Sequence, residues 1–264
     1  MGELVKKMNF TFSIITYAKD GVNGFLPQVV ESIRALKIPN YEILIVGTRD
    51  KINENPITSS VNYDIRVIDF DESVKAKWIT KKKNLITQHA KYNNIVYQHD
   101  YLIYDPNWYK GYKKTGGDFD ICINKILNLD GSRYRDWVVF PFHHAGHHPM
   151  AERLWAYTDI CNNESMLPYD ELRFTKWQYI SGAYWVAKKN VMQQFPLDER
   201  RVWGEGEDVD WSLRVRKRYD FSINANSTVH LLKQHNPAFG PIRPECLQKM
   251  AEYLDKIKRG EIKE

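Results

Sequence analysis

An acidic segment late in the chain has the residue types and the spacing for acid–base chemistry. Four carboxylates lie within the six residues 205–210, beside two glycines and between two tryptophans, Trp203 and Trp211. Carboxylates at a helix start are commonly explained by the helix dipole, against which each is worth about 0.3 to 1 kcal/mol. Dipole compensation does not need the glycines, which let a ligand approach the backbone, or the tryptophans, whose flat faces suit a sugar ring. A carboxylate in this setting could also take a proton from an attacking hydroxyl, so both interpretations stay open.

A second candidate group centres on Asp100, which follows an apolar run and the residues Gln98 and His99. A carboxylate at the end of a buried strand can bind Mg²⁺ or Mn²⁺ whose other ligands are phosphate oxygens. A lone aspartate at such a place is more often a turn residue or a helix N-cap. His230 follows a short strand-like stretch and could complete a cation site with a neutral imidazole nitrogen. A histidine near a strand end is more often a hydrogen-bonded structural residue.

Two clusters of like residues have simpler interpretations. The run Lys81–Lys83 is typical of a solvated helix face, and its place before Asp100 also makes Lys83 a candidate phosphate ligand. The four histidines of His143–His148 are spaced His-His-x-x-His-His, which does not match the usual structural zinc patterns. We therefore predict a mobile loop that faces an acceptor molecule rather than a zinc site.

The elements that position these residues alternate between strand and helix over the first hundred residues. This alternation is typical of a parallel α/β sheet covered by helices on both faces, in which ligands bind at the carboxyl ends of the strands. A polar helix is predicted from Glu207 through Arg214, a docking helix after Pro244, and irregular structure over about residues 118–176. The earlier predicted strands are 10–17, 42–47, 65–70 and 94–97, and the predicted helices are 26–36 and 79–90.

Composition limits the class of protein. The chain has 264 residues, with 38 Lys plus Arg against 33 Asp plus Glu, and the net charge of +5 is mild. This balance suits an anionic small ligand or an anionic membrane face better than nucleic acid, which selects clustered basic stripes. The three cysteines are too scattered for a disulfide framework, and no apolar run approaches the roughly 18 to 20 residues needed to span a bilayer. We expect a cytoplasmic protein, or one that is peripheral to a membrane.

Taken in order, these features resemble the glycosyltransferases of the GT-A fold, in particular the inverting family 2. Residues 12–17 resemble the family's opening strand and nucleotide-contacting turn, Lys83-Asn84 its Arg-Asn pair, and residues 98–100 its Asp-x-Asp motif. Residues 181–214 resemble the later half of the family, and the segment Trp-Gly-Glu-Gly-Glu-Asp at 203–208 is similar to one in galactosyltransferase-like enzymes. Gln98 replaces the first Asp of Asp-x-Asp, and residues 47–49 replace the acidic residues that usually follow the second strand.

The resemblance implies a fold and a mechanism. The fold is a mostly parallel GT-A sheet flanked by helices, in one domain over residues 8–235 with a helical tail over 236–264. A nucleotide-diphosphate sugar would give its sugar, with inversion, to a hydroxyl of a glycan or glycolipid. Asp208 would be the general base, Glu207 would hydrogen-bond acceptor or donor sugar, and Asp100 with His230 would hold Mn²⁺ or Mg²⁺. The implied donor-binding residues are Thr16, Tyr17, Ala18, Gly47, Thr48, Lys83, Gln98, His99, Gly182 and Trp203.

Two other classes of protein remain open. Because Gln98 replaces the first Asp of the motif, one alternative is a module that binds a nucleotide sugar or a glycan without turnover. A sugar nucleotidyltransferase would usually show a glycine-rich loop after its first strand, and Ala18-Lys19-Asp20-Gly21 is a poor version of one. The sequence does not define the oligomeric state.

Overall fold

The computed structural model describes residues 8–16, 24–53, 64–139, 165–174, 178–235 and 240–261. The predicted donor contacts at Tyr17 and Ala18 and the His143–His148 loop lie outside the described residues.

The N-terminal half forms four parallel strands in the order β3-β2-β1-β4. Strand β1 pairs with β2 on one side and with β4 on the other, so that Ile15 lies beside both Val46 and His99. All six residues of β1 are buried, as expected for a strand covered on both faces. The strands are β1 (Phe10–Ile15), β2 (Tyr41–Gly47), β3 (Ile65–Asp69) and β4 (Asn94–His99), and the helices are α1 (Leu26–Ala35), the short α2 (Arg49–Asn53) and α4 (Ile79–His89).

Strand β10 (Tyr184–Lys188) joins this half to the rest of the sheet. It runs antiparallel to β4 on one side and to β6 (Ile121–Asn128) on the other. Strand β11 (Phe221–Leu231) lies parallel to β6, and the short β5 (Leu102–Tyr104) pairs antiparallel with β11 at the sheet edge. The eight-stranded sheet therefore has the order β3-β2-β1-β4-β10-β6-β11-β5, with β10 and β5 running against the other six strands. The predicted mixed α/β fold with a mostly parallel sheet is confirmed.

Strand β6 corrects the expectation of irregular structure over residues 118–176. It lies between β10 and β11 with most of its residues buried. The sequence pattern hid this strand because Asn124 and Asn128 interrupt its apolar residues. Both side chains are buried and hydrogen-bonded: Tyr112 donates to Asn124 at 3.1 Å, and Asn128 donates to the backbone carbonyl of His235 at 2.8 Å. Satisfied polar groups of this kind can be buried at little cost.

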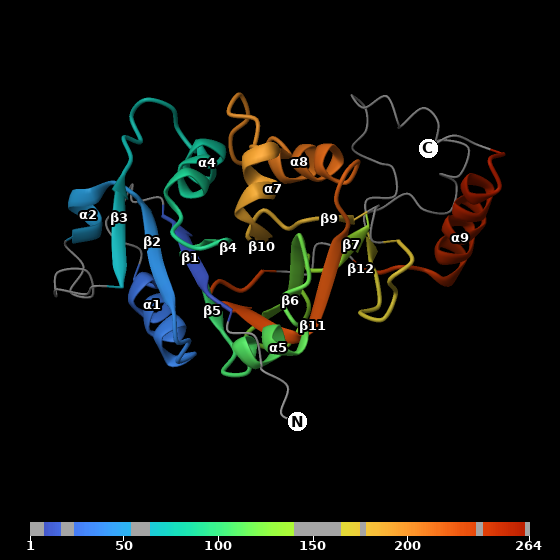
Figure 1. Cartoon of the computed structure of the whole chain (residues 1–264), viewed down its shortest axis with the longest axis horizontal. Coiled ribbons are helices and arrows are strands. Elements are labelled where there is room, and N and C mark those ends of the chain that lie inside the picture. The colour runs from blue at the N-terminus through green and yellow to red at the C-terminus, as the bar shows by residue number, and fades with distance from the viewer. Residues whose placement is uncertain are drawn as a thin grey trace.

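Helices cover both faces of the sheet, and each face has its own core (Figure 1). On one face α4, α7 (Lys189–Gln194) and α8 (Glu207–Val215) pack through residues such as Ile86 and Trp211. On the other face α1 and α5 (Trp108–Lys114) pack against the alternate residues of β1. A smaller sheet has the order β12-β8-β7-β9 and consists of β7 (Val138–Val139), β8 (Ser165–Met166), β9 (Gln178–Tyr179) and β12 (Gly240–Pro241).

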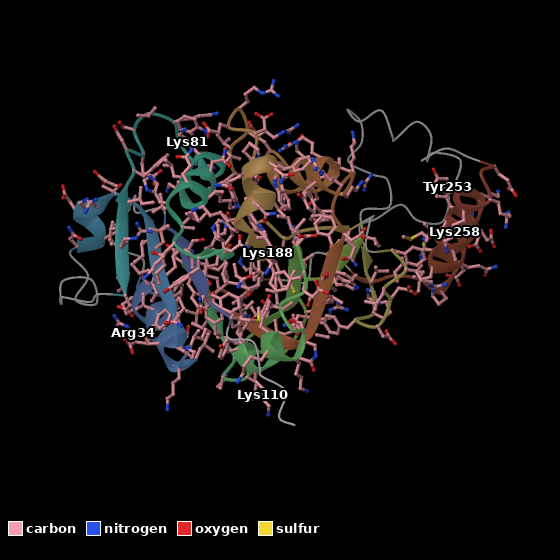
Figure 2. The ribbon with its side chains drawn as sticks, viewed as in Figure 1. Arg34, Lys81, Lys110, Lys188, Tyr253 and Lys258 are labelled. Atoms are coloured by element: carbon pink, nitrogen blue, oxygen red, sulfur yellow. The ribbon has the colours of Figure 1, made fainter. Side chains whose placement is uncertain are left out.

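The predicted C-terminal helix is α9 (Pro244–Lys258), which lies at the far end of the molecule from β3 (Figure 1). Its Cys246 and Met250 are buried in the same core as α4 and α8. Figure 2 shows Tyr253 and Lys258 on this helix. Across the described ranges, the structure has no helix whose length and hydropathy would let it cross a bilayer.

Candidate active site

The acidic segment forms the start of α8, as predicted. Gly204 and Gly206 have φ angles of 88° and 66°, in the left-handed region that favours glycine, and these turns lead the chain into Glu207. Glu207 is buried and Asp208 half-buried at the first turn of the helix. Burial raises the pKa of Glu207 above its usual range, with the charge of Lys83 acting against it.

Gly182 holds these two carboxylates in close contact with the turn before β10. Its backbone N–H donates to Asp208 Oδ2 at 2.8 Å, while Asp208 Oδ1 accepts from the N–H of Val209 at 2.9 Å. A Cβ on residue 182 would lie 2.9 Å from Asp208 Oδ2 and 3.1 Å from Glu207 Oε1. A residue with a side chain would therefore displace the carboxylates, which gives the predicted site residue Gly182 a steric role.

Asp100 lies in a polar group at the carboxyl ends of β1 and β4. Thr16 donates from Oγ1 to Asp100 Oδ2 at 2.7 Å, and the Thr16 carbonyl accepts from Lys82 Nζ at 2.7 Å. The same ammonium of Lys82 forms an ion pair with Glu72. Glu72, Lys82, Thr16 and Asp100 thus join the segments that follow β3, β1 and β4.

Gly47 lies against this group at the end of β2. A Cβ on residue 47 would lie 2.6 Å from Cγ2 of Thr16 and 3.2 Å from its carbonyl oxygen. Thr48 follows as the residue before α2, and its carbonyl accepts from Ile52 at 3.1 Å. The predicted site residues Thr16, Gly47 and Thr48 thus lie together at one edge of the sheet.

His99 and Gln98 point in different directions because they are neighbours on a strand. Burial and then the charge of Lys83 lower the pKa of His99 to about 3, so its imidazole is neutral at pH 7. The side chain of Gln98 accepts from the hydroxyl of Tyr104, in the core on the α1 and α5 side. For Gln98 the expectation of a donor contact needs correction, since its side chain is 1% exposed and turned away from Asp100's neighbours.

His230 lies near the end of β11, three residues along the sheet from the position that the register places opposite Asp100. His230 pairs in register with Ile103 of β5, and the next turn is tied by a hydrogen bond of 2.8 Å from the Leu232 N–H to the Tyr101 carbonyl. Within the described part of the chain, no three His, Cys, Asp or Glu side chains form a group that could hold a metal ion. A divalent cation that takes one or two protein ligands and completes its shell with phosphate oxygens fits this donor set.

The Asp100 group and the α8 carboxylates lie in one region, linked by two tyrosines. Burial raises the pKa of Tyr101, and the charges of Tyr134 and Asp100 raise it further. Burial also raises the pKa of Tyr134, and Asp208 adds to that effect. The backbone joins the two groups more directly, because the His99 N–H donates to the Ala183 carbonyl at 3.1 Å and the Gly182 N–H donates to Asp208 Oδ2 at 2.8 Å. Asp100 and Asp208 therefore lie near the same junction between β4 and β10.

Trp203 is exposed beside this region. Its side chain is 55% exposed, and Lys77 Nζ lies 5.0 Å from the centroid of its ring. The Trp203 N–H also donates to the carbonyl of Lys77 at 3.0 Å. Lys77 has a φ of 58°, which is uncommon for a residue other than glycine. The exposed ring is thus held at the approach to α8 by a strained neighbour.

The Lys81–Lys83 run is not a solvated face as expected. Only Lys81 lies on the outside of α4, where it forms an ion pair of 3.0 Å with Glu199 (Figure 2). Lys82 and Lys83 are 2% and 1% exposed, and Lys83 Nζ donates to the carbonyl of Gly182 at 2.9 Å. A phosphate contact by Lys83 stays a prediction, but the ammonium is not presented to solvent.

Sequence reasoning missed Lys82, Glu72, Tyr101 and Tyr134. A signal existed for the burial of Lys82 and of its neighbour Lys83. Both lie three or four residues from Ile79 and Ile86, on the apolar side of the helix. The tyrosines belong to loops, and nothing in their spacing shows that the fold brings them together.

The sheet order and the helices on its two faces define the GT-A fold, and comparison with solved structures shows the same fold. No family model matches the sequence, and no curated protein matches it. The structure of GalNAc-T7 with UDP, GalNAc and Mn²⁺ matches with a TM-score of 0.58 at 14% identity, over 95% of this chain and 48% of that one. Residues 1–349 of S. aureus TarS match with a TM-score of 0.52 at 11% identity, over 94% of this chain and 64% of that one. A longer S. aureus TarS structure matches at 0.56 and 9%, over 95% and 39%. This chain therefore spans less than two thirds of the neighbours' length.

Proposed function

We propose that the protein is a glycosyltransferase that moves a sugar from a nucleotide-diphosphate sugar to a hydroxyl group. The observation that carries this proposal is the meeting of two acidic groups at one edge of the sheet, Asp100 with Thr16 and Asp208 with Gly182. The GT-A neighbours are glycosyltransferases, and one was solved with UDP, GalNAc and Mn²⁺. That likeness supports the class of donor without identifying the sugar.

The donor would lie across the carboxyl ends of β1, β2 and β4, as ligands do in open α/β sheets. Thr16, Gly47 and Thr48 line the part of this edge nearest β2, with Tyr17 and Ala18 as further predicted contacts. Asp100, with His230 as a helper, would hold Mn²⁺ or Mg²⁺ against the diphosphate. A bound cation supplies charge neutralisation for the departing nucleoside diphosphate.

Asp208 would act as the general base. Its two oxygens each accept one backbone N–H, which fixes the plane of the carboxylate and leaves a lone pair on each oxygen for a hydroxyl. The acceptor oxygen would lose its proton to Asp208 and bond to the anomeric carbon as the bond to the diphosphate breaks. A direct attack from the face opposite the leaving group inverts the anomeric centre. Glu207 would hydrogen-bond acceptor or donor sugar, and the exposed face of Trp203 would pack on a sugar ring.

The acceptor class, location and domain limits are parts of the same proposal. We propose a glycan or glycolipid acceptor, a role in polysaccharide biosynthesis, and a cytoplasmic protein that can lie at a membrane surface. The catalytic domain would be residues 8–235, with residues 236–264 as a helical tail packed on it. Nucleic acid is not a proposed partner.

The first prediction tests this function with a donor panel. UDP-, GDP-, CMP- and dTDP-sugars are screened with Mn²⁺ or Mg²⁺ for thermal stabilisation, and the donors that bind are assayed for transfer and hydrolysis, with EDTA as the control. We expect stabilisation that EDTA abolishes, and turnover that Asp208→Asn lowers by at least about 100-fold because the general base is lost. The variant should bind the donor as the wild type does, since Asp208 contacts the acceptor.

Three outcomes would contradict the proposal. Tight nucleotide binding without turnover on any acceptor would favour a binding module. Release of pyrophosphate from a nucleoside triphosphate would indicate a nucleotidyltransferase. Turnover that is nearly unchanged in Asp208→Asn would remove Asp208 as the base.

A further inference from the structure

Lys83 is a buried cation whose position the proposed donor-binding role does not explain. Its side chain is 1% exposed, its Nζ donates to the Gly182 carbonyl at 2.9 Å, and the same atom lies 4.6 Å from the centroid of the Trp185 ring. Removing an ammonium group from water costs several kcal/mol unless other charges and hydrogen bonds compensate. The surroundings of Lys83 must therefore supply that compensation.

The compensation comes from the two carboxylates at the start of α8. Burial lowers the pKa of Lys83, while the charges of Glu207 and then Asp208 act to raise it. In return, the charge of Lys83 opposes the effect of burial on the pKa of Glu207. Lys83 and Glu207, both buried, and the half-buried Asp208 thus form one charge group drawn from α4 and α8.

Gly182 links Lys83 to Asp208 through the hydrogen bonds of its backbone. Its carbonyl accepts from Lys83, and its N–H donates to Asp208 Oδ2 at 2.8 Å. Lys83 and Asp208 thus contact the two opposite polar groups of one glycine, at which any side chain would crowd the carboxylates of Asp208 and Glu207. A shift of the Lys83 ammonium would move Gly182 and, with it, the hydrogen-bond donor of Asp208.

Other charged groups that face this cluster are few among the described residues. Arg201 lowers the pKa of Glu207 more weakly than Lys83 does. Tyr134 faces Asp208, and His99 faces Lys83 with a neutral imidazole. Lys83 is therefore the main cation acting on Glu207.

We propose that Lys83 is a positioning residue that orients Asp208 through Gly182, rather than a phosphate ligand. This inference rests on the proposed function for its catalytic meaning, but its physical content does not depend on turnover. In Lys83→Met, Glu207 loses its main opposite charge, and Gly182 loses the donor to its carbonyl. The carboxylate of Asp208 is then less well placed to accept a proton.

The direct test is a ¹³C-carboxyl NMR titration of the full chain without donor. The charge of Lys83 opposes the rise that burial causes in the pKa of Glu207, so Lys83→Met should raise the apparent pKa of Glu207 further. The Gly182 amide resonance should shift as well. Lys81→Met is the matched control, because Lys81 lies two residues before Lys83 on the same helix but forms its ion pair with Glu199 on the outside. An unchanged carboxyl titration in Lys83→Met would overturn the inference.

Two further measurements keep the test decisive if Lys83→Met does not fold. Lys83→Arg retains the charge and should keep the pKa of Glu207 near the wild-type value. In the wild type, the Lys83 Nζ and Cε resonances should follow the titration of Glu207. The absence of that coupling would contradict the inference without any variant.

Kinetics separate positioning from phosphate binding. We expect Lys83→Met to lower kcat about 10-fold or more and to leave nucleotide affinity within about twofold. Weakened nucleotide binding with an unchanged kcat would instead support the phosphate role and overturn the inference. If the wild type transfers no sugar from any donor, the proposed function fails, while the NMR titration still decides the role of Lys83.

Discussion

Asp208 owes its suitability as a base to the residues around it. An isolated carboxylate has a pKa near about 4 and is ionised at neutral pH wherever it is exposed. Here backbone donors from Gly182 and Val209 fix its orientation, and Glu207 lies buried beside it. Two adjacent acids therefore meet different surroundings, one hydrogen-bonded and half-buried and the other buried, and this difference suits them to different roles.

His99 should make the stability of the protein depend on pH. Because its pKa is about 3 in the folded protein and about 6.5 in the unfolded chain, the unfolded state binds more protons below pH 6.5. The free energy of unfolding should therefore fall as the pH drops from about 6.5 toward 3, by at most about 1.4 kcal/mol per pH unit from this group. Because the His99 side chain is partly exposed, the change in the free energy of unfolding per pH unit should be smaller than this limit.

His99→Gln, which has no titrating side chain, provides the comparison. Urea denaturation of both proteins between pH 7.5 and 4.5, in EDTA, should show the wild type losing stability relative to the variant as the pH falls. Parallel curves over that range would mean that His99 titrates alike in both states.

At the scale of elements, α9 tests how the tail belongs to the fold. Met250 is 2% exposed and lies in the same core as α4 and α8, whereas Gln248 is exposed on the same helix. Met250→Ala should lower the free energy of unfolding by about 2 to 5 kcal/mol, because it removes buried methylene groups and leaves a cavity. Gln248→Ala should change it by no more than about 0.5 kcal/mol.

Denaturant unfolding followed by far-UV circular dichroism measures both variants. If Met250→Ala is as stable as Gln248→Ala, the tail contributes little to the core. A separate early transition in the wild type would instead show that α9 unfolds as an independent unit.

The helices and strands that the sequence predicted best are those with a single strong period. Strand β1 is a continuous apolar run, and α8 begins where the glycines and acids placed its start. The sequence pattern did not predict strand β6. Its buried Asn124 and Asn128 are hydrogen-bonded to partners on α5 and in the chain after β11, and no local pattern reveals such partners. Local signals predict an element, whereas its tertiary hydrogen bonds decide which polar residues it can bury.

The candidate site was predictable to a similar extent. The resemblance placed Asp100, Asp208 and Gly182 together, and the fold puts them at one edge of the sheet. It also assigned Lys83 to the phosphates and Gln98 to the donor, although one is buried beneath Gly182 and the other bonds Tyr104 in the core. The direction in which a side chain points depends on the register of its strand or the phase of its helix, which short motifs do not contain.

At the scale of the whole molecule, the sheet depends on β10 for its continuity. In the described sheet, β4 and β6 are joined only through this five-residue strand, which lies between them. A fragment of residues 1–128 contains β1 to β6 but leaves β4 and β6 without their shared neighbour. We expect this fragment to show no cooperative thermal transition and poorly dispersed amide resonances, in contrast to the full chain.

A sharp melting transition of the fragment 1–128, with dispersed amide signals, would contradict that expectation. It would mean that the parallel half of the sheet folds without β10.

The late position of β10 also has a consequence for biosynthesis. The ribosome must release the chain through Lys188 before the seam between the two halves of the sheet can close. Until then β4 and β6 have unpaired strand edges, and open edges of this kind pair readily with other chains. Expression at low temperature or with chaperones that shield extended segments should therefore improve the soluble yield more than changes to the surface of the finished protein.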